Sequence, residues 1–95
     1  MSIDTATVLR RSRDIRHRRI DGEAVVVRQK AAEVLVMNEV AARLLDLADG
    51  HASISAWVDA LAGEYDVDRE TLERDVLHFA AELAAEGMLE IADGV

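Results

Sequence analysis

The sequence contains no cysteine and no proline, and only three histidines. Without cysteine the chain can form no disulfide, no thiolate metal site and no cysteine nucleophile. His17, His51 and His78 lack the spacing of metal ligands, and no glycine-rich phosphate loop or nucleophile motif accompanies them. We therefore expect no metal site, no cofactor and no catalytic residue.

Long apolar runs are also missing. No segment approaches the roughly 20 apolar residues that span a membrane, and the N-terminus has no apolar block of the kind found in signal peptides. No internal repeat, low-complexity run or linker divides the 95 residues, of which 51% are hydrophobic. The sequence therefore predicts one small cytoplasmic domain with no membrane partner.

Negative charge dominates, with a formal net charge of −8, but its distribution is uneven. Residues 1–43 contain nine Lys/Arg and six Asp/Glu, a net charge of +3. Residues 44–95 contain two Lys/Arg and thirteen Asp/Glu, a net charge of −11. Because an acidic excess repels nucleic acid, only the N-terminal half is suited to meet an anion.

Six arginines and a histidine are concentrated in the segment RRSRDIRHRR, residues 10–19. Its first part shows no sustained periodicity, so we assign residues 1–13 to a flexible lead-in and residues 14–92 to the folded domain. From Ile15 onward, IRHRRI and EAVVVRQ flank Asp21-Gly22, which is typical of a β-hairpin. EVLVM, residues 33–37, is a third β-prone run.

The hairpin register is predicted from the expectation that one face is buried and the other exposed. A three-residue loop, Asp21-Gly22-Glu23, separates an apolar face from a cationic one. The predicted buried face consists of Ile15, His17, Val25 and Val27, and the exposed face of Arg16, Arg18 and Arg28.

After residue 37 the apolar period changes from two to about 3.6. Three helices are predicted, capped by Asn38, Ser53 and Asp68, with Asp49-Gly50 ending the first and Gly87 the third. Their apolar stripes are Val40, Ala41, Leu44, Leu45 and Leu47; Ile54, Trp57, Val58 and Leu61; and Leu72, Val76, Phe79 and Leu83. The predicted fold class is α+β, with a three-stranded antiparallel β-sheet followed by three α-helices that cover one face of the sheet.

Several short motifs follow one another from about Glu33 to Leu89. They are VMNEVAARLLDLADG, the helix start Ser53-Ile54, EYDVD, and LERDVLHFAAELAAEGML. In order and spacing they resemble the PqqD-like proteins, the founding members of the recognition elements for precursors of ribosomally synthesised and post-translationally modified peptides (RiPPs). Met37-Asn38 is similar to the family's Leu-Asn at the strand-to-helix junction, and Asp75-Val76 to its Asp-Val. The chain departs from the proteins dedicated to pyrroloquinoline quinone assembly, because it reads RQKAAE where they have Pro-Glu.

The resemblance implies a winged helix-turn-helix-like fold without enzymatic activity. Such proteins bind the leader segment of a precursor peptide and present it to a modifying enzyme, often a radical SAM enzyme, in RiPP or pyrroloquinoline quinone-type biosynthesis. The leader is held as a strand added beside the third strand, against the third helix. The peptide-binding residues expected here are Val34, Leu35, Val36, Met37, Leu72, Arg74, Asp75, Val76, His78 and Phe79.

The chemistry of these residues agrees with that role. Residues 34–37 contain no charge and no proline, so their backbone is a suitable template for strand addition. The apolar stripe of the third helix would supply a groove wall, although such a stripe also faces a core. Arg74, Asp75 and His78 lie beside it, at the rim of a groove or on a solvated surface.

Other functions are compatible with parts of the sequence. A winged helix-turn-helix DNA-binding regulator is the main alternative, but residues 68–87 hold six Asp/Glu and two Arg, a net charge of −4, which opposes phosphate binding. Asp75 and His78 are three residues apart, as in a pair that orients a catalytic imidazole. An open strand could also pair with a second copy of the chain to form a homodimer. The arginines could form a solvated strand face or steer an acidic leader or partner.

Overall fold

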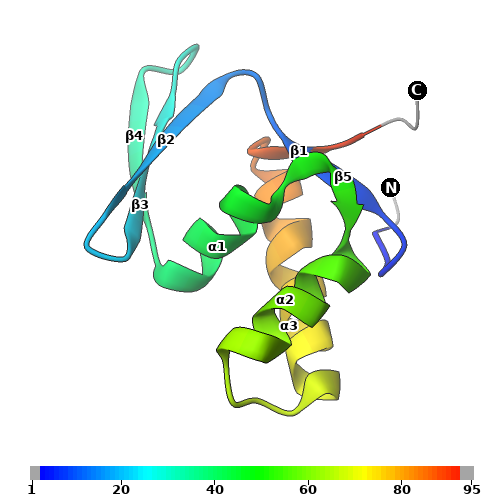
Figure 1. Ribbon diagram of the computed structural model, residues 1–95. Coiled ribbons are helices and arrows are strands. Elements are labelled where there is room, and N and C mark those ends of the chain that lie inside the picture. Colours follow the sequence, from blue (N-terminus) through cyan, green and yellow to red (C-terminus); the bar gives the residue numbers. More distant parts are fainter. Residues whose placement is uncertain (1–2, 93–95) are drawn as a thin grey trace.

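Two small antiparallel sheets and three helices make up the computed structural model, which describes residues 3–92 (Figure 1). One sheet has the strand order β2-β3-β4 and the other the order β5-β1-β6. In Figure 1 the first sheet lies at the left and the second at the upper right, with α1 between them and α2 and α3 below. The predicted α+β class is confirmed, but the prediction contained only one of the two sheets.

A tight hairpin joins β2 (Ile15–Ile20) to β3 (Glu23–Arg28). Both turn residues have positive φ angles, 51° at Asp21 and 84° at Gly22, as a two-residue turn of type I′ requires. Ile20 therefore pairs with Glu23, and the predicted three-residue loop is wrong. β4 (Glu33–Met37) pairs with β3 along its whole length, which confirms the third predicted strand.

The two-residue turn changes which side chains share a face. Ile15 is buried as predicted, but it shares its face with Ala24 and Val26, while Val25 and Val27 lie on the opposite face. Arg16 and Arg18 are exposed on that outer face, as predicted. Arg28 is not beside them, because it lies on the inner face and its guanidinium donates a hydrogen bond to the backbone carbonyl of Glu86.

The inner face is not uniformly apolar because α1 supplies partners for its polar residues. His17 Nε2 lies 3.3 Å from a carboxylate oxygen of Asp46, and Arg19 donates to the other oxygen of that carboxylate at 2.9 Å. The predicted register rested on separating a buried face from the cationic one, and these contacts allow cationic side chains on the inner face as well.

The second sheet includes residues from the segment 1–13, which was predicted to be a flexible lead-in. β1 (Val8–Arg11) is the central strand, between β5 (Asp49–Ser53) and β6 (Leu89–Ile91). The Leu9 side chain is completely buried. The folded part of the chain therefore begins before residue 14.

The helices begin at the three predicted caps. α1 (Glu39–Leu47), α2 (Ile54–Glu64) and α3 (Arg69–Ala85) each start with a capping side chain that accepts a backbone hydrogen bond. Asn38, Ser53 and Asp68 accept from the N–H three residues further on, at 2.9, 3.2 and 3.2 Å. Gly87, with φ of 78°, ends α3 as predicted.

One hydrophobic core joins the helices to both sheets. Trp57 is completely buried and is its largest fully buried side chain. The same core contains buried aliphatic residues of α1, α2, α3 and the second sheet: Leu44, Leu45, Ile54, Val58, Leu61, Val76, Leu83, Leu9 and Leu89. Phe79 is only half-buried, unlike the rest of the predicted α3 stripe.

Candidate functional site

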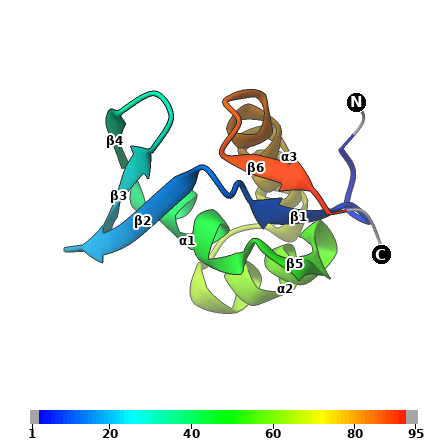
Figure 2. The same cartoon turned by 90° about the horizontal axis from the view of Figure 1, so that it is seen from above.

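β4 forms one edge of its sheet, and no strand from residues 3–92 lies along its outer side (Figure 2). Its uncharged residues alternate in environment. Val34 and Val36 are 63% and 64% exposed, whereas Leu35 and Met37 are half-buried and pack against the core. The pairing with β3 has no irregularity. β4 therefore presents a regular row of free backbone N–H and C=O groups, which is a template for an additional strand.

An apolar hollow of about 150 Å³ lies among the first turn of α1, which follows β4 in the chain, the C-terminal end of α2 and the N-terminal half of α3. Val40, in the first turn of α1, forms one part of its wall, and the N-terminal half of α3 forms another. The complete lining is Val40, Leu61, Tyr65, Val67, Leu72, Asp75, Val76 and Phe79. An apolar hollow next to an open strand edge can hold an anchoring side chain of a ligand whose backbone pairs with that edge.

Four of the six residues predicted on α3 line this hollow. They are Leu72, Asp75, Val76 and Phe79. Leu72 and Val76 also belong to the core, so Phe79 is the apolar side chain of this helix with most surface left to meet a ligand.

Arg74 and His78, the other two residues predicted on α3, do not line the hollow. Both are exposed or half-exposed at the surface of the helix. His78 Nε2 lies 3.2 Å from the carboxylate of Glu82, and its ring stands edge-on to that of Phe79 with the centroids 6.2 Å apart. The acidic partner of His78 is thus Glu82, so the structure gives no support to a catalytic pair of Asp75 and His78.

Four lining residues were not among those predicted for the site: Val40, Leu61, Tyr65 and Val67. Tyr65 and Val67 belong to the motif EYDVD, and both lie in the loop between α2 and α3. Val67 is 45% exposed and lies between two acidic residues. Large apolar side chains in an otherwise acidic loop were the available signal, but only the fold shows that this loop meets α1 and α3.

The hollow has apolar walls and an acidic border. Burial raises the pKa of the Tyr65 hydroxyl, and the nearby carboxylates of Glu39 and Glu64 raise it further. A hydrogen bond from Arg43 lowers the pKa of Glu64, and that same bond raises the pKa of Arg43. Arg43 is held in this pair and does not line the hollow. Asp75 is the charged residue of the lining, so the hollow disfavours an anionic ligand group.

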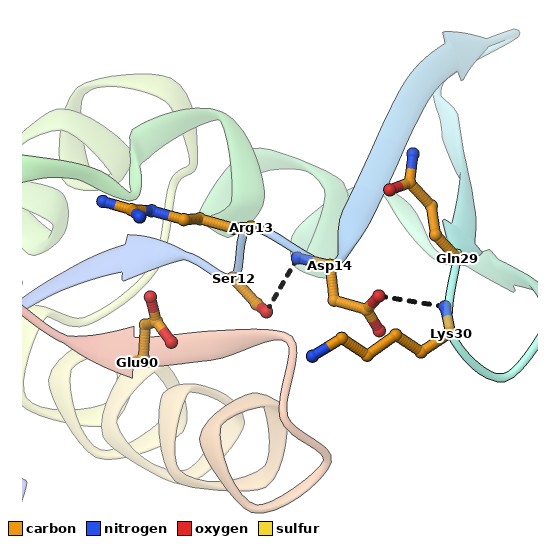
Figure 3. A pocket seen from close by; sticks show the side chains of 6 residues that line it. All are labelled: Ser12, Arg13, Asp14, Gln29, Lys30 and Glu90. Atoms are coloured by element: carbon orange, nitrogen blue, oxygen red, sulfur yellow. Dashed lines mark hydrogen bonds between the residues drawn. The ribbon is translucent and has the colours of Figure 1, made fainter.

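A larger, polar hollow of about 470 Å³ lies where the chain passes from β1 to β2 (Figure 3). Asp14 organises it, because its carboxylate accepts a hydrogen bond from the Lys30 N–H at 2.9 Å and its own N–H donates to Ser12 Oγ at 3.2 Å. The lining is Ser12, Arg13, Asp14, Gln29, Lys30 and Glu90. With two cations balanced by two carboxylates and no large apolar side chain, this hollow provides no anchor of the kind found beside β4.

Three of the six arginines of residues 10–19 are engaged within the domain. Arg10 pairs with Glu90 at 2.9 Å, Arg11 donates to the Leu45 carbonyl at 2.7 Å, and Arg19 pairs with Asp46. Arg16 and Arg18 form no ion pair with any residue between 3 and 92. Arg13 lines the polar hollow, so the positive charge of this segment that forms no ion pair in this range is divided between that hollow and the outer face of the sheet.

Two structural features are absent from the described part of the chain. Among residues 3–92, no three His, Asp or Glu side chains come together in a way that could bind a metal ion. None of the helices in this range has the length and apolar character needed to cross a membrane.

A small α+β domain with an open strand edge and an apolar hollow has the features of a module that accepts a peptide as an added strand. Residues 23–89, from the start of β3 to the first residue of β6, match the family described as coenzyme PQQ synthesis protein D (PqqD). The chain belongs to the PqqD family, as its motifs predicted.

Curated relatives include PqqA binding proteins of Rhodopseudomonas palustris. One is 41% identical over 56 residues, which cover 59% of this chain and 55% of the relative. Another, from strain BisB5, is 39% identical over the same length and shares. The chain thus spans about half the length of these relatives.

Two solved structures share the fold over nearly their whole length. TbiB1 in complex with the TbiA(beta) leader peptide has a TM-score of 0.77 and 31% identity, covering 85% of this chain and 94% of TbiB1. A lasso peptide synthetase B1 complexed with the leader peptide has a TM-score of 0.68 and 27% identity, covering 86% and 96%. Each of these neighbours is thus a protein captured with a leader peptide.

Proposed function

We propose that this protein is a non-catalytic carrier that binds the leader segment of a ribosomally made precursor peptide as a strand added to β4. The observation that carries the proposal is the regular, uncharged free edge of β4, together with the apolar hollow whose wall includes Val40 of the helix that follows this strand. The PqqA binding proteins and the two leader complexes support it, because members of the same family and proteins of the same fold bind such peptides.

In this proposal each part of the site has a separate task. The β4 backbone pairs with the leader backbone irrespective of sequence. Leu35 and Met37 on the inner side of β4, together with Phe79 on α3, contact leader side chains that point inward. The hollow takes one apolar anchor, and Asp75 favours a neutral or cationic group beside it. Arg74 and His78 remain proposed contacts at the outer rim of α3.

The expected affinity is that of a reversible carrier. About five backbone hydrogen bonds at roughly 1 kcal/mol each, with two or three apolar anchors at about 2 kcal/mol each, give on the order of 10 kcal/mol. Ordering a flexible peptide costs about 2 to 5 kcal/mol, and association costs several more. Roughly a few kcal/mol remain, which corresponds to weak and readily reversible binding and allows the peptide to be passed on.

We further propose that the bound leader is presented to a peptide-modifying enzyme in the cytoplasm, and that α2, α3 and the β2–β3 hairpin correspond to the elements of a winged helix-turn-helix. A DNA-binding role for this arrangement is disfavoured by charge. Residues 68–87 carry a net charge of −4, and phosphate binding depends on cations.

Amide hydrogen exchange of the protein with and without peptide tests the strand addition. The probes are synthetic PqqA and the TbiA(beta) leader. Because alternate residues of an edge strand direct their N–H groups away from the sheet, binding should slow exchange at every second amide of residues 33–37. Binding of a probe without protection in β4 would contradict strand addition, and failure of both probes to bind would contradict the choice of leader.

A proline substitution provides a second test. Val36→Pro removes a backbone donor and stiffens the edge, so it should weaken probe binding at least tenfold in a variant that circular dichroism shows to be folded. Val36→Ala keeps the N–H and is the matched control. An unchanged dissociation constant in folded Val36→Pro would contradict pairing along β4.

A further inference from the structure

The outer face of the sheet β2-β3-β4 carries two rows of side chains that run across the strands. In one row Arg16 pairs with Val27, and Val27 with Val34; in the other Arg18 pairs with Val25, and Val25 with Val36. Each row thus begins with an arginine on β2 and ends with a valine on β4. This face points away from the helices, and no described element covers it (Figure 2).

Exposure increases along each row toward the free edge. Val25 and Val27, in the central strand, are half-buried because they have a neighbour on each side. Val34 and Val36, in the edge strand, are 63% and 64% exposed because they have a neighbour on one side only. Two β-branched side chains of an edge strand therefore lack the cross-strand partners that a further strand would supply.

We propose that the leader is read on both of its faces, with Val34 and Val36 selecting its outward-pointing side chains. The inference rests on the proposed strand addition and extends it from the backbone to the outer side chains. An added strand in either direction sets alternate residues opposite β4 on the outer face. The residues opposite Val34 and Val36 are then β-branched or aromatic, since such pairs stabilise a sheet.

A peptide contacted on both faces has a different sequence pattern from a peptide contacted only by a groove on one face. A strand with one face in a groove and the other in water alternates between apolar and polar residues. A strand read by Leu35 and Met37 on one side and by Val34 and Val36 on the other is apolar over three or more consecutive positions. The leader segment bound here therefore has a short continuous run of β-branched or aromatic residues.

A display library of random twelve-residue peptides, selected on the wild-type protein, tests this without assuming any leader sequence. The expected result is enrichment of peptides with at least three consecutive apolar residues, rich in Val, Ile, Thr, Tyr or Phe. Enrichment of strictly alternating apolar and polar residues would overturn the two-sided contact while leaving strand addition intact. If no peptide enriches, the proposed function itself fails.

Matched variants then assign the effect to the β4 side chains, with one enriched peptide as the probe. The double substitution Val34→Thr and Val36→Thr keeps the β-branched shape but replaces a methyl group with a hydroxyl. It should raise the dissociation constant about three- to thirtyfold. The control, Val25→Thr and Val27→Thr, makes the same changes on the same face one strand further from the peptide. Equal effects of the two double variants, or no effect of the first, would overturn the inference.

Discussion

The two sheets have three strands each, but their edge strands differ in length and regularity. In the sheet β5-β1-β6 both edges are poor templates for pairing. β6 has only three residues, and the register between β1 and β5 shifts between Val8 and Arg10. In the sheet β2-β3-β4 the edge strand β4 has five residues in unbroken register with β3. Since exposed regular edges invite aggregation, the retention of one such edge indicates a use for it.

The opposite edge of that same sheet sharpens the contrast. β2 carries Arg16, Arg18 and Arg19, and charged side chains on an edge strand discourage further pairing. β4, two strands away, has no charge from Val34 to Met37. The sheet is thus open on one side only, which directs a ligand strand to β4.

The largest expected effect concerns the sheet that the sequence did not predict. Leu9→Ala should reduce the free energy of unfolding by about 3 kcal/mol, because Leu9 is completely buried and its truncation leaves a cavity. Urea unfolding measures this change. Val34→Ala on the open edge is the control and should change stability by less than about 0.5 kcal/mol. If Leu9→Ala costs no more than the control, β1 does not contribute to the fold as described.

A smaller effect is expected at the wall of the apolar hollow. Phe79→Ala should weaken leader binding about ten- to hundredfold, as the loss of one partly exposed apolar anchor implies, with a smaller effect on stability than Leu9→Ala. Isothermal titration with PqqA or an enriched library peptide measures this. His78→Ala, at the outer rim of the same helix and outside the hollow, should weaken binding much less, by about two- to fourfold. Equal losses for both would place the ligand on the outer side of α3.

Local signals account for the parts of the fold that the sequence predicted. The caps Asn38, Ser53 and Asp68 and the positions of the strand 33–37 are set by neighbouring residues, and the structure has them as expected. The second sheet could not be predicted this way. Its strands come from three distant segments, and β5 reads DGHAS, which has no apolar alternation. β5 pairs with β1, whose other neighbour β6 is still more distant in the sequence, and this pairing supplies what the local pattern lacks.

The predicted hairpin register was wrong for a related reason. The sequence shows that Arg19 and His17 are polar, but not that Asp46 of α1 lies across from them. At the candidate site, β4 and the α3 positions were predictable because they follow regular periods. The walls contributed by Tyr65 and Val67 depend on how a loop folds back onto α1 and α3.

The smallest expected effect concerns the arginines of β2. If they keep this edge closed, replacing Arg16 and Arg18 with Thr should remove the charges from the outer face of this edge, so that the average mass by light scattering rises with concentration more steeply than for the parent chain. Leader affinity should stay within about twofold, because β2 lies two strands from the docking edge. A slower association with leader at low salt, without a change in mass, would instead assign the two arginines to electrostatic steering. The basic segment would then serve encounter with an acidic ligand, whereas the structure favours a role in confining strand addition to β4.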